Sequence, residues 1–252
     1  MKKNRPYVLS IAGYDPCGGA GVLADIKTFE TIGVYGLAVT TGITYQNDHK
    51  FAGVHWLSKK KIKNQLYPLL EAYKVEYVKI GLIESLEVLS EVIELLLGYN
   101  NEIKIIWDPI LKASAGFSFH KKISKKYLKH IIDSAAWITP NWEEVQSLTG
   151  ESDAVKGAEQ LAAHCNVYLK GGHNVETPAT DMIWINRKLD ILHPAKISEL
   201  EKHGTGCVLS SAIVAYMALG NAQHKSCELA KEYTYQFLIS NETNLGYHKM
   251  ND

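Results

Sequence analysis

Apolar residues recur along the chain in two ways: in short unbroken runs, and in longer stretches where they return every three or four positions. The runs are typical of buried strands, and the longer stretches are typical of helices that cover one face of a sheet. Residues 7–12 (YVLSIA) predict a strand, and Val22, Ile26 and Phe29 then share one face of a helix that begins near Gly21. The chain therefore opens with a strand, a glycine-rich loop and a helix.

The remaining sequence continues this alternation. The predicted strands cover residues 37–45, 77–82, 103–107, 136–139 and 167–170, followed by a hairpin over 181–186 and 189–193. The predicted helices cover residues 62–73, 86–97, 124–133, 143–148, 154–164, 208–219 and 226–240. Such alternation predicts an α/β fold with a mostly parallel sheet covered on both faces. Because no repeat or low-complexity linker divides the chain, we expect residues 1–252 to form a single domain.

Unusual residues cluster directly after the predicted strands. Ligands of open α/β sheets lie outside the carboxyl ends of the strands, so a candidate site is expected at that edge. Five such loops follow strands in order: Gly13-Tyr14-Asp15, Gln46-Asn47-Asp48, Asp108-Pro109, Thr139-Pro140-Asn141 and Lys170-Gly171-Gly172.

Composition and charge exclude several classes of protein. Hydrophobic residues make up 46% of the chain and charged residues 21%, as in ordinary globular proteins. Lys+Arg and Asp+Glu balance at 27 each, so the basic excess of a nucleic-acid-binding protein is missing. No apolar run is long enough to span a membrane, and the one behind the basic start is too short for a signal peptide. We therefore expect no nucleic-acid or membrane partner.

The four cysteines, at positions 17, 165, 207 and 227, show neither a CxxC pair nor regular spacing. This pattern argues against a disulfide framework and against a zinc site. Reduced thiols are typical of the cytoplasm, which is the predicted location.

The first glycine-rich loop contains the opening half of a P-loop, from Gly13 to Gly18. Gly19 and Ala20 stand where that motif needs lysine and Ser/Thr, and the third glycine of a dinucleotide fingerprint is absent. A Walker ATPase and a Rossmann dehydrogenase are therefore disfavoured. The glycines still allow the backbone to approach a ligand at a helix N-terminus, although a plain tight turn is equally compatible. Asp25, one turn into the helix, either caps locally or binds a ligand.

A second glycine-rich turn, His203-Gly204-Thr205-Gly206-Cys207, precedes a predicted helix. Its glycines permit a sharp turn that exposes successive N–H groups, and with the helix dipole these N–H groups form an anion hole. The same dipole is expected to lower the pKa of the Cys207 thiol. The alternative is a helix cap with a buried cysteine.

Two carboxylates follow predicted strands on this edge. Asp108 ends a buried strand, and Glu144 lies within one turn after Pro140-Asn141. Together they could hold Mg²⁺ directly or through water, as phosphate transfer requires, although each alone is compatible with a cap or a surface charge. Lys170 could contact a nucleotide phosphate, or simply end a strand.

Together these segments resemble the hydroxymethylpyrimidine/phosphomethylpyrimidine kinases of thiamine biosynthesis, within the ribokinase-like superfamily. The matching segments occur in family order and span nearly the whole chain, and the first and last are the most specific. They are IAGYDPCGGAGVLADIKTFETIGVYG (11–36), TYQND (44–48), KIGLI (79–83), DPIL (108–111), ITPNWEEVQSLTG (138–150), LKGGH (169–173) and HGTGCVLSSAI (203–213).

The resemblance implies a three-layer α/β/α ribokinase-like fold and Mg²⁺-dependent transfer of the ATP γ-phosphate to a pyrimidine hydroxymethyl group, then to the resulting monophosphate. It assigns a pyrimidine pocket to Gln46, Gly13, Asp25, Thr44, Leu82 and Ile110. It assigns Mg²⁺ and the phosphates to Asp108, Asn141 and Glu144, and the nucleotide to Lys170 and Thr205. Cys207 would act as base where most ribokinase relatives have aspartate, and the backbone at Gly204 and Gly206 would stabilise the transition state. A homodimer is the implied assembly.

Two departures from the family pattern stand out. The family usually has Ala-Lys-Ser-Gly after Asp-Pro, with its lysine near the transferring phosphate, whereas Lys112 here stands two positions early in the segment 112–116. Either Lys112 substitutes for that lysine or the loop differs. The family's Gly- and His-rich C-terminal segment is also abbreviated, to residues 245–248 (LGYH). The loop after Gly116 and the hairpin at 181–193 are candidate flaps.

Two other functions are compatible with these motifs. A pyridoxal kinase of the same cysteine-containing subgroup acts on a similar hydroxymethyl ring, and only Gln46 favours the aminopyrimidine over it. A non-catalytic pyrimidine-binding regulator is disfavoured because Asp108, Glu144 and Cys207 are all present.

Overall fold

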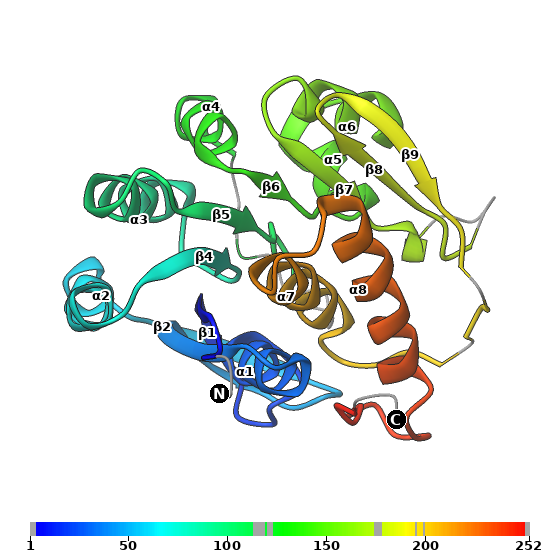
Figure 1. Ribbon diagram of the computed structural model, residues 1–252, viewed down its shortest axis with the longest axis horizontal. Coiled ribbons are helices and arrows are strands. Elements are labelled where there is room, and N and C mark those ends of the chain that lie inside the picture. The colour runs from blue at the N-terminus through cyan, green and yellow to red at the C-terminus, as the bar shows by residue number, and fades with distance from the viewer. Residues whose placement is uncertain are drawn as a thin grey trace.

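The computed structural model describes residues 4–112, 119, 123–173, 178–194, 196–198 and 200–249. Within these residues the chain forms a sheet of nine strands in the order β3-β2-β1-β4-β5-β6-β7-β8-β9 (Figure 1). The strands are β1 (Tyr7–Tyr14), β2 (Tyr35–Gln46), β3 (Phe51–Trp56), β4 (Val75–Ile80), β5 (Lys104–Trp107), β6 (Trp137–Ile138), β7 (Asn166–Leu169), β8 (Asp181–Ile185) and β9 (Lys188–Leu192).

The central strands of this sheet are parallel. β1 pairs in parallel with β2 and β4, and parallel pairing continues from β4 through β5 and β6 to β7. Antiparallel strands complete both edges, with β3 beside β2 and the β8–β9 hairpin beside β7. The predicted mostly parallel sheet and the predicted hairpin are therefore confirmed. The carboxyl ends of the parallel strands share one edge, as a site at that edge requires.

Helices cover both faces of the sheet (Figure 1). One apolar cluster joins the sheet to five helices: α2 (Lys59–Ala72), α3 (Leu86–Tyr99), α4 (Lys125–Ser134), α5 (Trp142–Thr149) and α6 (Ala154–Ala162). A second cluster joins the opposite face to α1 (Gly21–Ile32), α7 (Thr205–Ala218) and α8 (Gln223–Leu238). The result is a three-layer α/β/α arrangement. Helix α7 is buried along most of its length because it is enclosed between the sheet, α1 and α8.

One strand was not predicted, and the helices α2, α7 and α8 each begin three residues before their predicted starts. β3 was not predicted, since its six residues (FAGVHW) include a glycine and a histidine and are only partly buried at the edge of the sheet. Helix α7 begins at Thr205, three residues before the predicted start, because Gly204 adopts the left-handed conformation that precedes it. A short 3₁₀ turn, Gly171–His173, also follows β7. Among the described residues, no helix has the length and apolar character needed to cross a membrane.

Candidate active site

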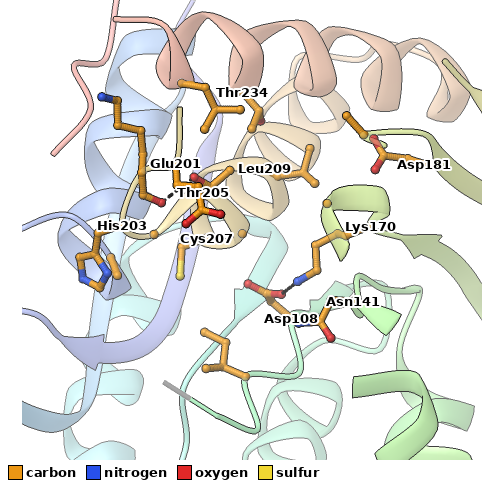
Figure 2. A pocket seen from close by; sticks show the side chains of 18 of the residues that line it. Asp108, Asn141, Lys170, Asp181, Glu201, His203, Thr205, Cys207, Leu209 and Thr234 are labelled. Carbon is orange, nitrogen blue, oxygen red and sulfur yellow. Dashed lines mark hydrogen bonds and ion pairs between the residues drawn. The ribbon is translucent and has the colours of Figure 1, made fainter. Parts of the chain in front are cut away.

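A cavity of about 1460 Å³ lies at the carboxyl edge of the parallel strands. Loops far apart in the sequence meet there, and Figure 2 shows Asp108, directly after β5, beside Lys170, directly after β7, and near the start of α7. Eleven of the predicted site residues that line it are Gly13, Thr44, Gln46, Leu82, Asp108, Ile110, Asn141, Glu144, Lys170, Thr205 and Cys207. Gly204 and Gly206 line it as well. The structure thus brings together thirteen of the fourteen residues that the sequence singled out.

The N-terminus of α7 forms the anion-binding end of this cavity. Gly204 is its N-cap, with φ of 78°, and the first helical hydrogen bond runs from the Val208 N–H to the Gly204 carbonyl at 3.0 Å. The N–H groups of Gly206 and Cys207 precede that bond and therefore point out of the helix end. A Cβ added to Gly206 would lie 3.5 Å from the Lys170 ammonium. Lys170 and these N–H groups therefore flank the same space, which suits a phosphate.

Asp108 is the buried carboxylate of the site. Its side chain is 1% exposed and accepts hydrogen bonds from Lys170 Nζ at 2.9 Å, Ser210 Oγ at 3.0 Å and Thr139 Oγ1 at 3.2 Å. Burial lowers the pKa of Lys170, but the negative charges of Asp108 and Glu144 outweigh this effect and raise the pKa above its ordinary value. Lys170 therefore stays an ammonium at neutral pH.

Glu144 is held by the start of α5. Its side chain accepts the Asn141 N–H at 2.7 Å, and the Asn141 side chain accepts the Glu144 N–H at 2.8 Å, which together form a capping box. Burial raises the pKa of Glu144 to about 7; Lys170, whose Nζ lies 3.5 Å from its carboxylate, opposes this shift and Asp108 adds to it. Two buried carboxylates thus face each other across a single ammonium. A divalent cation would relieve their repulsion, so the donor set fits Mg²⁺.

The expected pKa shift of Cys207 is contradicted by the structure. The thiol is 6% exposed, and burial raises its pKa to about 11, even though the Lys79 ammonium acts in the opposite direction. Desolvation of the thiolate outweighs the dipole of α7, which the sequence alone suggested would dominate. Cys207 is therefore a neutral thiol at pH 7.

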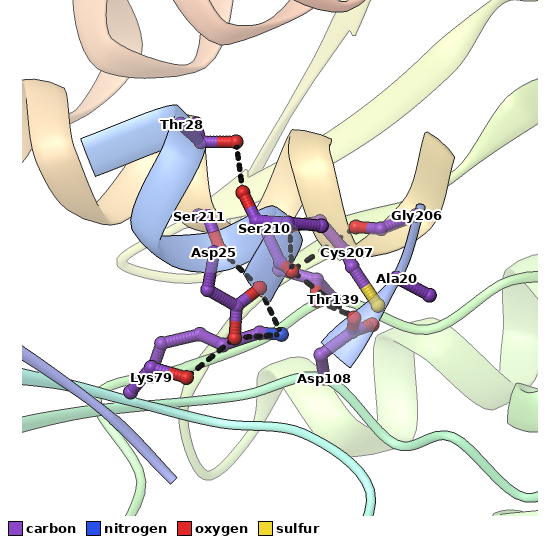
Figure 3. A network of polar contacts seen from close by, with 12 residues as sticks. Ala20, Asp25, Thr28, Lys79, Asp108, Thr139, Gly206, Cys207, Ser210 and Ser211 are labelled. Carbon is purple, nitrogen blue, oxygen red and sulfur yellow. Dashed lines mark hydrogen bonds and ion pairs between the residues drawn. The ribbon is translucent and has the colours of Figure 1, made fainter. Parts of the chain in front are cut away.

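Asp25 also differs from its expected place. Its carboxylate is fully buried below the cavity instead of lining it, because it pairs with Lys79 Nζ at 2.9 and 3.0 Å. The hydroxyls of Ser10 and Ser211 donate to the same carboxylate at 2.5 and 2.7 Å (Figure 3). The network joins β1, β4, α1 and α7. Asp25 thus serves the packing of these elements beneath the cavity.

Except for Asp25, the residues expected to face the pyrimidine line the same cavity as Lys170. Leu82 packs over Gly13 so closely that a Cβ on Gly13 would lie 2.8 Å from Leu82 Cδ2. The Thr44 hydroxyl donates to the Tyr14 carbonyl at 2.9 Å, which ties β2 to β1 there. Gln46 ends β2 and faces the cavity. Leu82 and Ile110 give the cavity apolar surface and Gln46 gives it an amide, which together suit a small nitrogen ring.

The two departures from the family pattern have different outcomes. Lys112 lines the cavity but pairs with Glu143 at 2.8 Å, and its side chain is 55% exposed. Residues 113–116, and the flap expected after Gly116, lie outside the described residues. At the C-terminus, His203 N–H donates to the Asn244 carbonyl at 2.9 Å, so the segment just before 245–248 braces the turn that precedes α7.

The sequence did not indicate a role for several residues that lie at or beneath the site. Asp181, seen only as part of a hairpin, accepts the Gly171 N–H at 2.6 Å and pairs with Lys231 at 2.5 Å, so it fixes the turn after Lys170. Ser210 lies in the matched segment 203–213 with no assigned role, yet its hydroxyl donates to Asp108. Lys79 stood in a matched segment with no role. Their partners are distant in sequence, so no local pattern marked them.

Comparison with known proteins adds the family. A model described as phosphomethylpyrimidine kinase matches residues 15–251, nearly the whole chain. The chain belongs to this family. A curated hydroxymethylpyrimidine/phosphomethylpyrimidine kinase from Bacillus subtilis (strain 168) is 34% identical over 252 residues, covering 94% of this chain and 90% of that one. The identification made from the sequence segments, including kinase character, is therefore confirmed.

Solved structures agree with the fold. The crystal structure of a phosphomethylpyrimidine kinase from Clostridium difficile 630 is 34% identical, with a TM-score of 0.78 over 92% of this chain and 99% of that chain. A pyridoxal kinase from Staphylococcus aureus, solved with ADP, has a TM-score of 0.83 over 97% of this chain and 92% of its own, but only 22% identity. The second likeness concerns the fold alone, and both confirm the expected ribokinase-like architecture.

Proposed function

We propose that this protein transfers the γ-phosphate of ATP to the hydroxymethyl oxygen of 4-amino-5-hydroxymethyl-2-methylpyrimidine, and then phosphorylates the resulting monophosphate. The observation that carries the proposal is one cavity lined both by an anion-binding helix end with Lys170 and by Leu82, Gly13 and Gln46. Family membership supports the same substrates.

The residues divide the transfer between them. The N–H groups of Gly206 and Cys207, with the Lys170 ammonium, would hold the phosphoryl oxygens where negative charge builds up. Asp108 and Glu144 would hold Mg²⁺, which when bound neutralises charge on the phosphates. Gln46 would hydrogen-bond the aminopyrimidine and so direct the hydroxymethyl group inward. Asn141 and Thr205, which also line the cavity, would contact the nucleotide.

Cys207 would act on the substrate hydroxyl. As the new O–P bond forms and the bond to the leaving ADP breaks, the hydroxyl proton must be removed. A neutral thiol can orient the hydroxyl, and only its ionised form can accept that proton. Because the pKa of Cys207 is about 11, the thiolate is a minor form at neutral pH. The proposal thus makes the rate depend on positioning more than on a strong base.

A single assay tests the proposal against its nearest alternative. ADP release is measured with ATP and Mg²⁺ in the presence of the hydroxymethylpyrimidine, its monophosphate, pyridoxal or pyridoxamine. We expect kcat/KM to be highest with the pyrimidine and its monophosphate. Faster turnover of pyridoxal than of either pyrimidine would make the protein a pyridoxal kinase. Tight binding without turnover of any of the four would instead support a non-catalytic regulator.

We further propose a cytoplasmic homodimer. All four cysteines are free, which suits a reducing compartment. The side chains of Ile43 and Tyr45 on β2 are exposed, and they offer apolar surface to a second copy. Sedimentation equilibrium should give twice the mass of one chain. Replacement of both Ile43 and Tyr45 by charged residues should reduce the measured mass to that of a single chain.

A further inference from the structure

A cluster of Asp15, Cys17 and His203 joins the two glycine-rich turns of the site. His203 Nε2 lies 3.0 Å from Asp15 Oδ2, a contact between residues 188 positions apart. Both side chains are nearly enclosed, at 1% exposure for Asp15 and 9% for His203. Figure 2 places the His203 ring beside the turn that carries Thr205 and Cys207. The proposed function uses neither Asp15 nor His203.

Asp15 organises the first glycine-rich loop. Its carboxylate accepts the backbone N–H groups of Cys17 at 3.1 Å, Gly19 at 3.2 Å and Ala20 at 2.8 Å. Against the effect of burial, hydrogen bonds from His203, Cys17 and Ala20 hold the pKa of Asp15 below its ordinary value. The loop that leads into α1 is therefore built around this carboxylate.

The two turns are packed backbone against backbone. A Cβ on Gly204 would lie 1.9 Å from the Gly19 carbonyl oxygen, and a Cβ on Gly19 would lie 2.6 Å from the His203 ring. Such contacts leave no room for either turn to move alone. The Asp15–His203 contact adds a side-chain link between the same two turns.

Both turns lead to Cys207. His203 is continuous with Gly204–Cys207, while the loop around Asp15 sets the position of Gly21, whose N–H hydrogen-bonds the Cys207 thiol. We propose that Asp15 and His203 are positioning residues for phosphoryl transfer: their contact clamps the two glycine-rich turns so that Cys207 and the anion-binding N–H groups keep the geometry of the transfer step.

The distances would also allow a metal ion between Asp15, Cys17 and His203. The hydrogen bonds favour the clamp. One carboxylate oxygen accepts the Cys17 N–H and thiol, and the other accepts Gly19, Ala20 and His203. A metal would have to displace bonds that already satisfy both oxygens.

The test is a double-mutant cycle of Asp15→Asn and His203→Ala, with His203→Gln as the conservative variant and Cys17→Ser as the matched control. Each single variant should lower kcat by on the order of 10²-fold, with KM for both substrates within about threefold, since misplacement affects the transfer step. The double variant should lose little more than the worse single variant, because one contact is removed. His203→Gln keeps an N–H donor and should recover most of the loss. Cys17→Ser should stay near wild type.

The inference rests on the proposed function, so the variants are assayed on whichever of the pyrimidine and pyridoxal the wild type turns over faster. A wild type inactive on both refutes the proposed function, whereas the variant-to-wild-type ratio judges the clamp. Thermal melting curves are recorded for each variant, and a Tm above the assay temperature confirms that the variant is folded in the assay. Unchanged kcat in His203→Ala, losses that multiply in the double variant, or raised KM with unchanged kcat would each overturn the clamp. If Zn²⁺ inhibits the wild type, and Asp15→Asn, Cys17→Ser and His203→Ala each relieve that inhibition, the cluster is a metal site instead.

Discussion

Cys207 shows how strongly the surroundings of one side chain decide its chemistry. Its position at the start of α7 favours the thiolate, and so do the Lys79 charge and the Gly21 N–H. Burial and the charges of Asp25 and Asp108 favour the thiol, and together they win. Because the neutral thiol dominates at pH 7, Cys207 is better suited to orient a hydroxyl than to accept its proton.

Replacement of Cys207 should separate chemistry from binding. Cys207→Ala is expected to lower kcat by about 10²- to 10⁴-fold, the range for loss of a general acid–base group, with little change in KM. Initial rates at saturating ATP and pyrimidine give kcat, and substrate titrations give KM. Wild-type kcat in this variant would make Cys207 structural and place the base elsewhere.

The raised pKa gives a second prediction about Cys207. If the thiolate accepts the hydroxyl proton, wild-type kcat should rise about tenfold per pH unit from pH 7 towards a pKa near 11, because the ionised fraction rises by that factor. Cys207→Ser should flatten this rise, since serine does not ionise in the range. The measurement is kcat between pH 6.5 and 9.5, corrected for any unfolding. A flat wild-type profile would leave Cys207 only the orienting role.

At the scale of residues, the sequence predicted which side chains line the cavity better than it predicted their surroundings. It picked out Asp108, Lys170 and Cys207 because each follows a strand or opens a helix, where ligands gather. It misjudged the pKa of Cys207 and the place of Asp25, because both depend on Lys79, which is distant in sequence and approaches them only in the folded chain.

The turn before α7 matters as an element because its backbone conformation and its packing are both special. Gly204 has φ of 78° and touches Gly19, whereas Gly220, just past the end of the same helix, has φ of 90° and nothing within 4 Å of an added Cβ. The two positions therefore share the left-handed conformation and differ in contact. They form a matched pair for substitution.

Gly204→Ala should harm the protein more than Gly220→Ala. Alanine at Gly220 pays only for the left-handed backbone, about 1–2 kcal/mol of unfolding free energy. Alanine at Gly204 adds a collision with the Gly19 carbonyl, so we expect a larger loss of stability and a fall in kcat of more than about tenfold from displacement of the anion-binding N–H groups. Urea unfolding and initial rates measure the two effects. Equal losses in both variants would show that contact with Gly19 is unimportant.

At the scale of elements, periodicity predicted the strands and helices that bury a continuous apolar face. It missed β3 because an edge strand has one neighbour and needs little apolar surface. The periodicity placed the start of α7 too late because Thr205 and Gly206 carry no helical pattern. The helix nevertheless begins at Thr205, directly after its left-handed N-cap Gly204. The ends of elements depend on contacts across the fold, and these are the features that position the site.

The whole molecule is joined through the polar network beneath the cavity. The Asp25 carboxylate on α1 accepts hydrogen bonds from Lys79 on β4, Ser10 on β1 and Ser211 on α7, and none of the four is exposed to solvent (Figure 3). Burial lowers the pKa of Lys79, but the charges of Asp25, Cys207 and Asp108 raise it above its ordinary value. The lysine therefore stays charged. Two strands of the sheet and two helices of one layer are thus joined around a single buried ion pair.

Removal of one partner should therefore destabilise the whole fold. Lys79→Met leaves Asp25 buried without its counter-charge, and we expect a loss of about 3–5 kcal/mol in unfolding free energy by urea titration. The control is Lys59→Met, which breaks ion pairs with Glu87 and Glu91 on the surface and should leave stability near wild type. If Lys79→Met matches the control, the buried pair contributes nothing to stability. Where the variant stays folded, the rise of kcat with pH should move to higher pH, since the charge that lowers the Cys207 pKa is gone.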